Sequence, residues 1–249
     1  MSKLSAIADT LREIAGCAKN RKTAAIIVAA GSSTRMGTPK QFIPLCGVPA
    51  VARTLMAYQN SNLITSIVVV AREVDLERYN KIKAKYSITK LCAIVKGGDT
   101  RQDSVLRGVE AVPKGTAYVA IADGARPLTT VETIERVCIA AYRFDAATAA
   151  FPAYDTIKTA DNKGFIVSTV DRSTVWHAAT PQVFKLALYR AAAYSAKDEG
   201  FAATDDNSLV EHIGHKIKLV DCGRENIKLT EKQDIIMCEA IIKKREADK

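Results

Sequence analysis

The feature that most constrains the fold is a regular alternation of short apolar segments and longer amphipathic ones. The apolar segments are rich in valine, isoleucine and alanine, which is typical of buried strands, and they lie at residues 24–30, 63–71, 91–95, 118–122 and 146–150. Predicted helices lie between them, at residues 49–59, at residues 75–86, in a segment that ends near residue 112, and at residues 131–143. Strands that alternate with helices indicate an α/β fold with a doubly wound, mostly parallel sheet. Ligands of such sheets bind beyond the carboxyl ends of the strands, so we expect the site at that edge.

The alternation breaks between residues 152 and 182. A predicted strand at residues 165–170 follows a hairpin turn signal, Asp161-Asn162-Lys163-Gly164. An isolated hairpin is only marginally stable in water, so this one must pack against something else. We therefore predict a protruding β-hairpin arm at about residues 152–182.

The remaining segments complete a single domain that is predicted to span residues 23–249. Its last part contains predicted helices at residues 184–197, 205–213 and 231–244 and a predicted strand at residues 216–221. Before this domain, apolar residues recur at helical spacing, at Leu4, Ile7, Leu11 and Ile14. This spacing predicts an N-terminal helical extension over residues 1–22.

The composition narrows the class of partner. The net charge of +9 comes from 36 basic and 27 acidic side chains and favours anionic partners. The sequence has no basic run interleaved with aromatic residues, so nucleic acid is disfavoured and phosphorylated small molecules are the simpler explanation. No apolar run approaches the ~20 residues of a membrane span. The 6 cysteines include no C-x-x-C pair, which is typical of reduced thiols in a cytoplasmic protein.

The loop after the first apolar segment combines small residues with positive charge. From residue 24 to residue 45 the only charged side chains are Arg35 and Lys40. Backbone N–H groups at the end of a strand, together with two cations, form a cradle for phosphate groups. The P-loop pattern and the G-x-G-x-x-G dinucleotide fingerprint both fail here. An ordinary strand-to-helix turn therefore stands beside the phosphate-site interpretation.

Two further motifs follow predicted strands. The first, Gly97-Gly98-Asp99 with Ser104, combines small residues with short polar groups, which allow a ligand to approach closely; Ser104 by itself is equally typical of a helix start. The second begins with Asp123, which ends its strand and suits either a metal or ribose contact or an Asx turn. All three motifs lie at the same edge of the predicted sheet, which indicates one active site.

The order of these motifs resembles that of nucleotidylyltransferases, which join an NTP to a sugar phosphate or polyol phosphate. The signature comprises Ala29-Ala30-Gly31, Arg35-Met36-Gly37, Pro39-Lys40-Gln41 and Leu45-x-Gly47-x-Pro49, and its PKQ ending is similar to the cytidylyltransferase branch. Further motifs resemble, in the same order, those of the 2-C-methyl-D-erythritol 4-phosphate cytidylyltransferase family, at residues 97–105, 123–127, 155–158, 169–182, 204–206 and 225–230. Two positions depart from the family pattern: Ala122 stands where histidine is common, and Glu225 stands where aspartate is frequent.

The resemblance implies a Rossmann-like nucleotidyltransferase fold and a defined reaction. The enzyme would transfer CMP from CTP to 2-C-methyl-D-erythritol 4-phosphate, giving 4-diphosphocytidyl-2-C-methyl-D-erythritol and pyrophosphate for non-mevalonate isoprenoid biosynthesis. The resemblance also implies Mg²⁺ as the divalent metal and a homodimer in which the arm embraces the second subunit. A ribitol-5-phosphate cytidylyltransferase of cell-wall polymer synthesis is the alternative, because it has the same fold and motifs. A binding protein without turnover is disfavoured, because the cations are retained.

Both reactants are anions, so the site must supply positive charge and alignment more than acid–base chemistry. By the resemblance, the catalytic residues are Arg35, Lys40 and Lys228. The residues expected to bind CTP are Ala29, Ala30, Gly31, Ser32, Ser33, Thr34, Gly98, Asp99, Ser104, Asp123 and Gly124. Those expected to bind the polyol phosphate are Arg126, Thr156, Lys158, Arg172 and Thr180. The metal ligands would be Asp123 and Glu225.

Overall fold

The computed structural model describes residues 21–31 and 39–248. The predicted N-terminal helix lies almost entirely outside these ranges, and four predicted site residues lie outside them too, namely Ser32, Ser33, Thr34 and Arg35. Within the described part of the chain, no helix is both long enough and apolar enough to cross a lipid bilayer.

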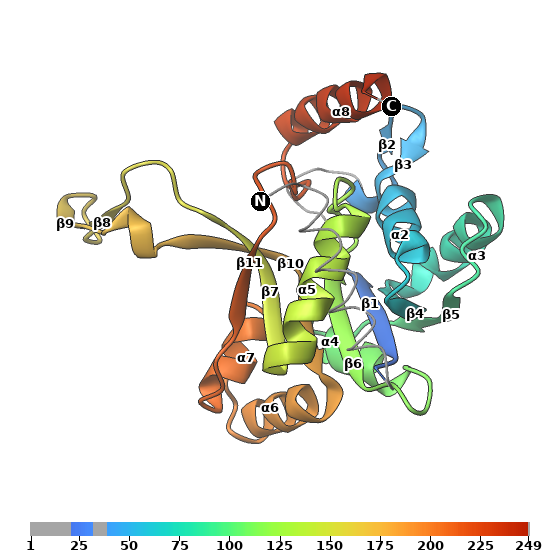
Figure 1. The fold of residues 1–249 in the computed structure, drawn as a ribbon, viewed down its shortest axis with the longest axis horizontal. Coiled ribbons are helices and arrows are strands. Elements are labelled where there is room, and N and C mark those ends of the chain that lie inside the picture. Colours follow the sequence, from blue (N-terminus) through green and yellow to red (C-terminus); the bar gives the residue numbers. More distant parts are fainter. Residues whose placement is uncertain (1–20, 32–38, 249) are drawn as a thin grey trace, which may run out of the picture.

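A seven-stranded sheet forms the centre of the molecule, in the order β11-β7-β10-β6-β1-β4-β5 (Figure 1). Its strands are β1 (Thr23–Ala29), β4 (Ile64–Ala71), β5 (Leu91–Lys96), β6 (Tyr118–Asp123), β7 (Ala146–Pro152), β10 (Trp176–Lys185) and β11 (Lys218–Asp221). Neighbouring strands are parallel, except that β10 runs antiparallel to both β6 and β7. The predicted doubly wound, mostly parallel sheet is therefore confirmed.

The strand β10 is not predicted by the sequence pattern, because its middle is irregular. Its pairing with β7 shifts register between Ala178 and Gln182, and Pro181 lies within that interval. Proline has no N–H to donate, so inside a sheet it is confined to edges and bulges. Regular pairing resumes at Gln182 and continues through Val183 and Phe184, which are fully buried. The residues assigned to the end of the arm thus belong to the centre of the sheet.

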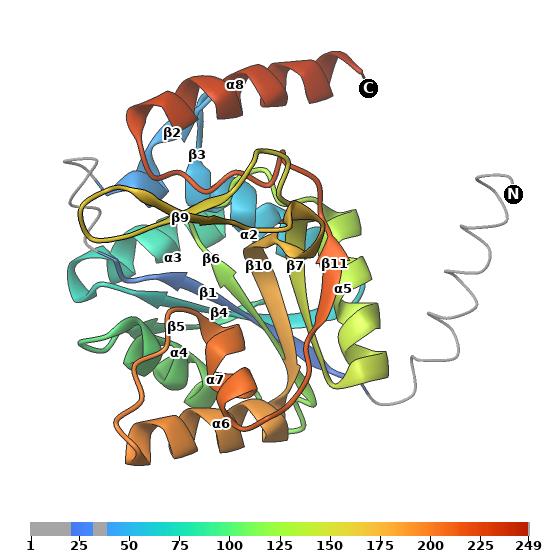
Figure 2. The same cartoon turned by 90° about the vertical axis from the view of Figure 1, so that its left-hand side faces the viewer.

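Helices cover both faces of the sheet (Figures 1 and 2). One face carries α2 (Ala50–Asn60), α3 (Leu76–Lys85), which follows the turn η3 (Glu73–Asp75), and α5 (Val131–Phe144); the other carries α4 (Arg101–Glu110), α6 (Leu186–Asp198) and α7 (Asp206–His212). In β1, Ala25 and Ile27 pack into the core on the first face, and Ile26 packs into the core on the second. A parallel strand that is buried on both faces reads as a continuous apolar run, which is the pattern of the sequence.

A third layer covers the carboxyl edge of the sheet. It contains η2 (Lys40–Phe42), the short hairpin of β2 (Pro44–Leu45) and β3 (Val48–Pro49), and α8 (Lys232–Ala247). Figure 2 shows α8 lying across the hairpin. Leu45 and Leu229 are fully buried and pack with Cys238 of α8. This layer places α8 over the loops in which the site was predicted.

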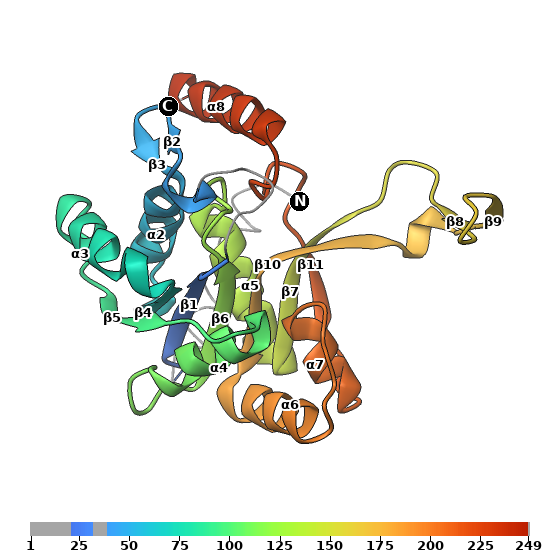
Figure 3. The ribbon, with the colours of Figure 1, turned by 180° about the vertical axis from the view of Figure 1, so that it is seen from behind.

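The arm extends away from the sheet between β7 and β10 (Figures 1 and 3). Within it, β8 (Lys158–Ala160) and β9 (Ile166–Thr169) pair in antiparallel fashion, and the turn η4 (Arg172–Thr174) leads back to β10. Three apolar side chains near its tip are between 66% and 70% exposed: Phe165, Ile166 and Val167. The predicted protruding hairpin is thus present in the fold.

Candidate active site

A cavity of about 430 Å³ opens where β1, β5 and β6 end. Ten predicted site residues line it: Ala29, Ala30, Gly31, Lys40, Gly98, Asp99, Ser104, Asp123, Gly124 and Lys228. They include every predicted CTP-binding residue that lies in the described ranges. The fold therefore brings four separate stretches of the chain to one place, while the individual roles of these residues stay predictions.

Lys40 lines the cavity because the residue after it is anchored to β1. Gln41 is 3% exposed, and its Nε2 donates a hydrogen bond to the Ala29 carbonyl at 3.0 Å. Ala29 is the last residue of β1, so this hydrogen bond holds η2 against the end of the strand. The PKQ motif thus pairs a lysine in the cavity with a glutamine that fixes its position.

The loop between β5 and α4 lies directly against the end of β1. A Cβ atom on Gly97 would lie 2.5 Å from the Ala30 Cβ and 2.9 Å from the Ser104 Oγ, so glycine is required for this close approach. Ser104 Oγ accepts a hydrogen bond from the Gly98 N–H at 3.0 Å. The N-cap of α4 is Thr100, so the helix-start alternative for Ser104 is wrong, and Ser104 fixes the loop instead.

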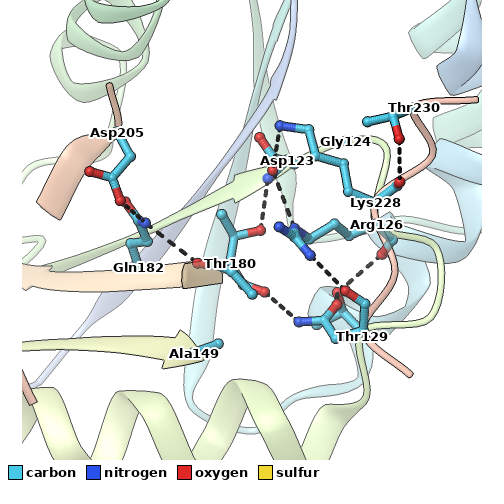
Figure 4. Close-up of polar contacts among 12 residues, drawn as sticks. Asp123, Gly124, Arg126, Thr129, Ala149, Thr180, Gln182, Asp205, Lys228 and Thr230 are labelled. Atoms are coloured by element: carbon cyan, nitrogen blue, oxygen red, sulfur yellow. Dashed lines mark hydrogen bonds and ion pairs between the residues drawn. The ribbon is translucent and has the colours of Figure 1, made fainter. Parts of the chain in front are cut away.

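Asp123 is the last residue of β6 and forms ion pairs with two basic side chains. Its Oδ2 lies 3.0 Å from Lys228 Nζ and 3.3 Å from Arg126 Nε (Figure 4). Burial raises the pKa of the Asp123 carboxyl, but the positive charges of Lys228, Arg126 and Arg101 outweigh burial and hold this pKa below its ordinary value. Asp123 is therefore a carboxylate at neutral pH.

Asn226 fastens the segment that carries Lys228. Its Nδ2 donates to the Thr180 carbonyl at 2.8 Å, and its Oδ1 accepts from Thr129 Oγ1 at 2.9 Å. The Asn226 carbonyl accepts from Arg126 Nη1 at 2.6 Å. Figure 4 shows Thr129, Thr180 and Arg126 gathered beside Lys228. Because the loop after β6 and the middle of β10 both bind Asn226, the backbone two residues before Lys228 is fixed.

Arg126 and Thr180 were predicted to contact the substrate, but both have protein partners here. Arg126 is 9% exposed and bridges the Asp123 carboxylate and the Asn226 carbonyl. Thr180 is 4% exposed, and its Oγ1 accepts from the Asp123 N–H at 3.1 Å. Both side chains therefore support Asp123, and their contact with substrate stays a prediction.

Arg101 links the cavity to a buried carboxylate. It lines the cavity, and its Nη2 lies 2.5 Å from Oδ2 of Asp206, which is fully buried. Tyr189 Oη donates to Asp206 Oδ1 at 2.8 Å, and Gln182 Oε1 accepts from the Asp206 N–H at 3.1 Å. Gln182 Nε2 donates in turn to Asp205 Oδ2 (Figure 4). Three of the motifs matched in the sequence thus meet in one hydrogen-bonded network.

Glu225 lies in a separate cavity from Asp123. Its Oε2 accepts hydrogen bonds from Arg245 of α8, from Nη2 at 2.8 Å and from Nε at 3.2 Å, and it lines that cavity together with Arg136 and Arg224. The structure does not bring the two predicted metal ligands together, because the cation that neutralises Glu225 is on α8. Among the described residues, no group of three or more His, Cys, Asp or Glu side chains is placed to hold a metal ion.

The predicted substrate residues of the arm lie outside the cavity of their own chain. Thr156, Lys158 and Arg172 are exposed. Lys158 Nζ donates to Thr169 Oγ1 at 2.6 Å, and Arg172 Nη1 donates to the Tyr154 carbonyl at 3.0 Å. Figures 1 and 3 show the arm pointing away from the sheet. Within one chain, these residues and Lys228 are therefore not brought together.

Sequence reasoning gave no role to Gln41, Asn226 or Asp234. The first two are buried amides one or two residues from a predicted catalytic lysine, and that pairing is the signal that could have identified them. Asp234 forms a capping box with Glu231 at the start of α8. The sequence signal for this box is an acidic residue three positions after the N-cap residue Glu231.

The chain is similar to named proteins over most of its length. The family model described as "IspD: 2-C-methyl-D-erythritol 4-phosphate cytidylyltransferase" matches residues 23–244. A protein of that name from Pelotomaculum thermopropionicum is 40% identical over 229 residues, which are 90% of this chain and 96% of the relative. Another from Geobacillus kaustophilus is 40% identical over 226 residues, which are 90% of this chain and 98% of the relative.

Solved structures agree with this assignment. The crystal structure of 4-diphosphocytidyl-2C-methyl-D-erythritol synthase from Anaerococcus prevotii has a TM-score of 0.82 at 29% identity, and the match covers 92% of this chain and 99% of that one. The crystal structure of 2-C-methyl-D-erythritol 4-phosphate cytidylyltransferase from Thermus thermophilus has a TM-score of 0.74 at 29% identity, with 90% and 99% covered. This chain therefore belongs to the 2-C-methyl-D-erythritol 4-phosphate cytidylyltransferase family of nucleotidyltransferases.

Proposed function

We propose that this protein transfers CMP from CTP to 2-C-methyl-D-erythritol 4-phosphate, giving 4-diphosphocytidyl-2-C-methyl-D-erythritol and pyrophosphate in the cytoplasm. The observation that carries this proposal is the convergence of Lys40, Lys228 and the Asp123 carboxylate with the predicted nucleotide loops in one cavity. Membership of the family supports the same substrates.

The chemistry needs alignment and positive charge. A phosphate oxygen of the polyol phosphate forms a bond to the α-phosphorus of CTP, and the bond from that phosphorus to the β-phosphate oxygen breaks, so pyrophosphate leaves with the electron pair. Lys40 and Lys228 stabilise the negative charge that develops on the phosphoryl oxygens. By the resemblance Arg35 adds a third cation, although it lies outside the described residues. Asp123 orients Lys228 through their 3.0 Å ion pair.

The base is proposed to bind beside Gly98, Asp99 and Ser104. The hydrogen bond between Ser104 and Gly98 holds this loop in one conformation, so its backbone groups can meet the edge of cytosine without prior reordering. Preorganised groups lose little entropy on binding. Discrimination against the other nucleotides would follow, because a base with the wrong donor and acceptor pattern leaves fixed polar groups unpaired.

We propose that the divalent metal is Mg²⁺ and that Asp123 is its protein ligand. The fit is chemical: Asp123 is ionised, it lines the cavity, and Mg²⁺ is commonly bound by one or two carboxylates together with substrate phosphates. A site with a single carboxylate would gain its remaining ligands from the triphosphate and water. When bound, the metal would neutralise triphosphate charge and assist the departure of pyrophosphate.

We propose a homodimer in which the arm of one chain reaches the site of the other. Two observations on the arm support this arrangement. Its tip exposes Phe165, Ile166 and Val167, which suits burial against protein. The predicted phosphate-binding residues Thr156, Lys158 and Arg172 are exposed and do not line the cavity, and the arm that carries them extends away from the sheet (Figures 1 and 3).

The experiment that tests the function is pyrophosphate release with CTP and Mg²⁺. Methylerythritol 4-phosphate and D-ribitol 5-phosphate are run in parallel as acceptors, and ATP, GTP and UTP serve as nucleotide controls. Rapid release with CTP and methylerythritol phosphate alone is the expected result. Preference for ribitol phosphate would keep the mechanism and assign the protein to wall-polymer synthesis. Absence of release with both would overturn the proposal.

A further inference from the structure

The first turn of α8 holds the segment that follows Lys228. Oδ2 of Asp234 accepts three hydrogen bonds: from the Thr230 N–H at 2.6 Å, from Thr230 Oγ1 at 2.8 Å and from the Glu231 N–H at 2.8 Å. The same Thr230 hydroxyl lies 3.5 Å from the Lys228 carbonyl. One carboxylate oxygen thus fixes the chain two residues after a lysine that lines the active-site cavity.

Other contacts of this segment hold the backbone on both sides of Lys228. The Leu229 N–H donates to the Ala125 carbonyl at 2.9 Å, and the Leu229 side chain is fully buried. Before the lysine, Asn226 is bound by Arg126 and Thr129 of one loop and by Thr180 of β10. The lysine side chain is long and flexible, so its Nζ position depends on how firmly the backbone on both sides is held.

The same helix also supports the part of the site that carries Lys40. Leu45, just beyond η2, is fully buried in the cluster that contains Cys238 of α8. The Cys46 N–H donates to Glu239 Oε1 at 3.0 Å. Burial raises the pKa of Asp234, but the hydrogen bonds from Glu231 and Thr230 and the positive charge of Lys40 outweigh it, so this pKa lies below its ordinary value. The first two turns of α8 therefore contact the segments that carry both lysines.

We propose that Asp234 is a positioning residue for nucleotidyl transfer, which fixes the Lys228 segment through Thr230 and keeps it in register with Lys40 across the cavity. This inference rests on the proposed function. Asp234 acts through its neighbours and does not touch the reactants. The expected effect is large, because a displacement of about 1 Å at a reacting centre costs on the order of 10²-fold in rate.

A purely structural role is the competing explanation, because Asp234 belongs to the capping box of α8. The chain supplies a matched control for that role. Glu231 is the other half of the box, and its side chain accepts from the backbone N–H of Asp234. Loss of either half weakens the start of α8 and should lower Tm. Only Asp234, however, binds the Thr230 hydroxyl and N–H.

The test compares Asp234→Ala, Asp234→Asn and Glu231→Ala with the wild type. For each protein, kcat and the KM for CTP are measured with methylerythritol 4-phosphate, and Tm is measured by calorimetry. We expect Asp234→Ala to lower kcat by about 10-fold to 100-fold while the KM for CTP changes by less than about threefold, as for an interaction used mainly in the transition state. Glu231→Ala should lower Tm similarly and leave kcat within about twofold, because it removes the cap alone.

Asp234→Asn tests whether the accepting oxygen, and not the charge of Asp234, holds the Lys228 segment. All three donors bind one oxygen, so an amide oxygen in the same place can accept them, and most of the lost kcat should return. If Asp234→Ala does not fold, Thr230→Val removes the hydroxyl contact alone and should still lower kcat with unchanged KM. Equal kcat in the Asp234→Ala and Glu231→Ala proteins would overturn the inference. An inactive wild type would instead overturn the proposed function.

Discussion

At the scale of single residues, the site is a balance of charges around Asp123. Its carboxylate faces Lys228 and Arg126, and Lys40 lines the same cavity. Without nucleotide the carboxylate offsets part of this positive charge. The bound triphosphate would then meet cations that are already in place, so little reorganisation is needed when charge develops in the transition state.

Removal of either lysine should therefore impair the chemical step. We expect Lys40→Ala and Lys228→Ala each to lower kcat by about 10²-fold or more, which is typical of the loss of one preorganised electrostatic contact. Steady-state pyrophosphate release measures the effect, and Lys81→Ala, at an exposed position on α3, is the matched control. Turnover near that of the wild type in either variant would remove the substituted lysine from the mechanism.

Loss of the Gln41 side-chain amide should lower kcat almost as much as loss of Lys40. Gln41→Leu keeps the size of the side chain but removes its hydrogen bond to the buried end of β1, and an unpaired buried polar group costs about 1–3 kcal/mol. We expect a lower Tm together with a fall in kcat, because η2 is then released from the strand. Gln59→Leu, on α2 and outside the cavity, removes hydrogen bonds to Thr89 Oγ1 and from the Lys90 N–H, so it should lower Tm and leave kcat unchanged. An unchanged kcat in Gln41→Leu would show that η2 is held in place by other contacts.

At the scale of elements, α8 packs against segments that flank the cavity without lining the cavity itself. Its packing partners are the β2–β3 hairpin and the segment of Leu229, and its first turn is bound to Thr230. The helix follows all the matched motifs in the sequence. It contributes no predicted catalytic group, yet it determines where two of them lie.

The stability that Asp234 gives to α8 should depend on pH in one direction. Its pKa in the folded protein lies below the ordinary value of 3.8, so its contribution is present above that ordinary value and is lost as the pH falls through the folded-state pKa. The difference in unfolding free energy between the wild type and Asp234→Ala, about 1 kcal/mol, should be constant from pH 7 to about pH 5 and shrink below about pH 4. Urea unfolding across this range measures it. A difference that grows on acidification would contradict the assignment.

At the scale of the whole molecule, the arm does not line the cavity of its own chain. It exposes three apolar side chains near its tip and carries predicted phosphate-binding residues away from the cavity. Exposure of such an apolar patch to water is unfavourable unless another surface covers it. In the proposed homodimer, a second copy would supply that surface and the anionic ligand at the same time.

Charge at the tip of the arm should therefore separate the subunits. We expect Ile166→Asp to give a monomer in sedimentation at micromolar concentration and to lower turnover strongly, because a buried unpaired carboxylate opposes association. Val74→Asp replaces another apolar side chain, which is 79% exposed on the body of the molecule, and should change neither property. A fully active monomer would contradict an arm shared between sites.

The sequence predicts the parallel strands well, because burial on both faces makes each one a continuous apolar run. It fails at β10, where Pro181 and a shift of register interrupt the pattern. The cavity residues were foreseen by the motifs, since the ends of parallel strands must meet at one edge. The partner of Glu225 was not, because Arg245 lies 20 residues further along the chain and nothing local links the two. The division into an extension and one domain stays a prediction.

The return of the arm beside its own starting point has a consequence for how such proteins diversify. Trp176 is paired with Pro152, and His177 with Phe151. The chain therefore leaves the sheet at the end of β7 and re-enters it at the start of β10, where the two strands are paired. The intervening residues form a cassette whose length and composition can change without altering the spacing of β7 and β10. In the proposed homodimer, substitutions at its tip could therefore redirect self-recognition without moving the strand ends that line the cavity. Two paralogues in one cell could in this way avoid mixed assemblies by altering the cassette alone.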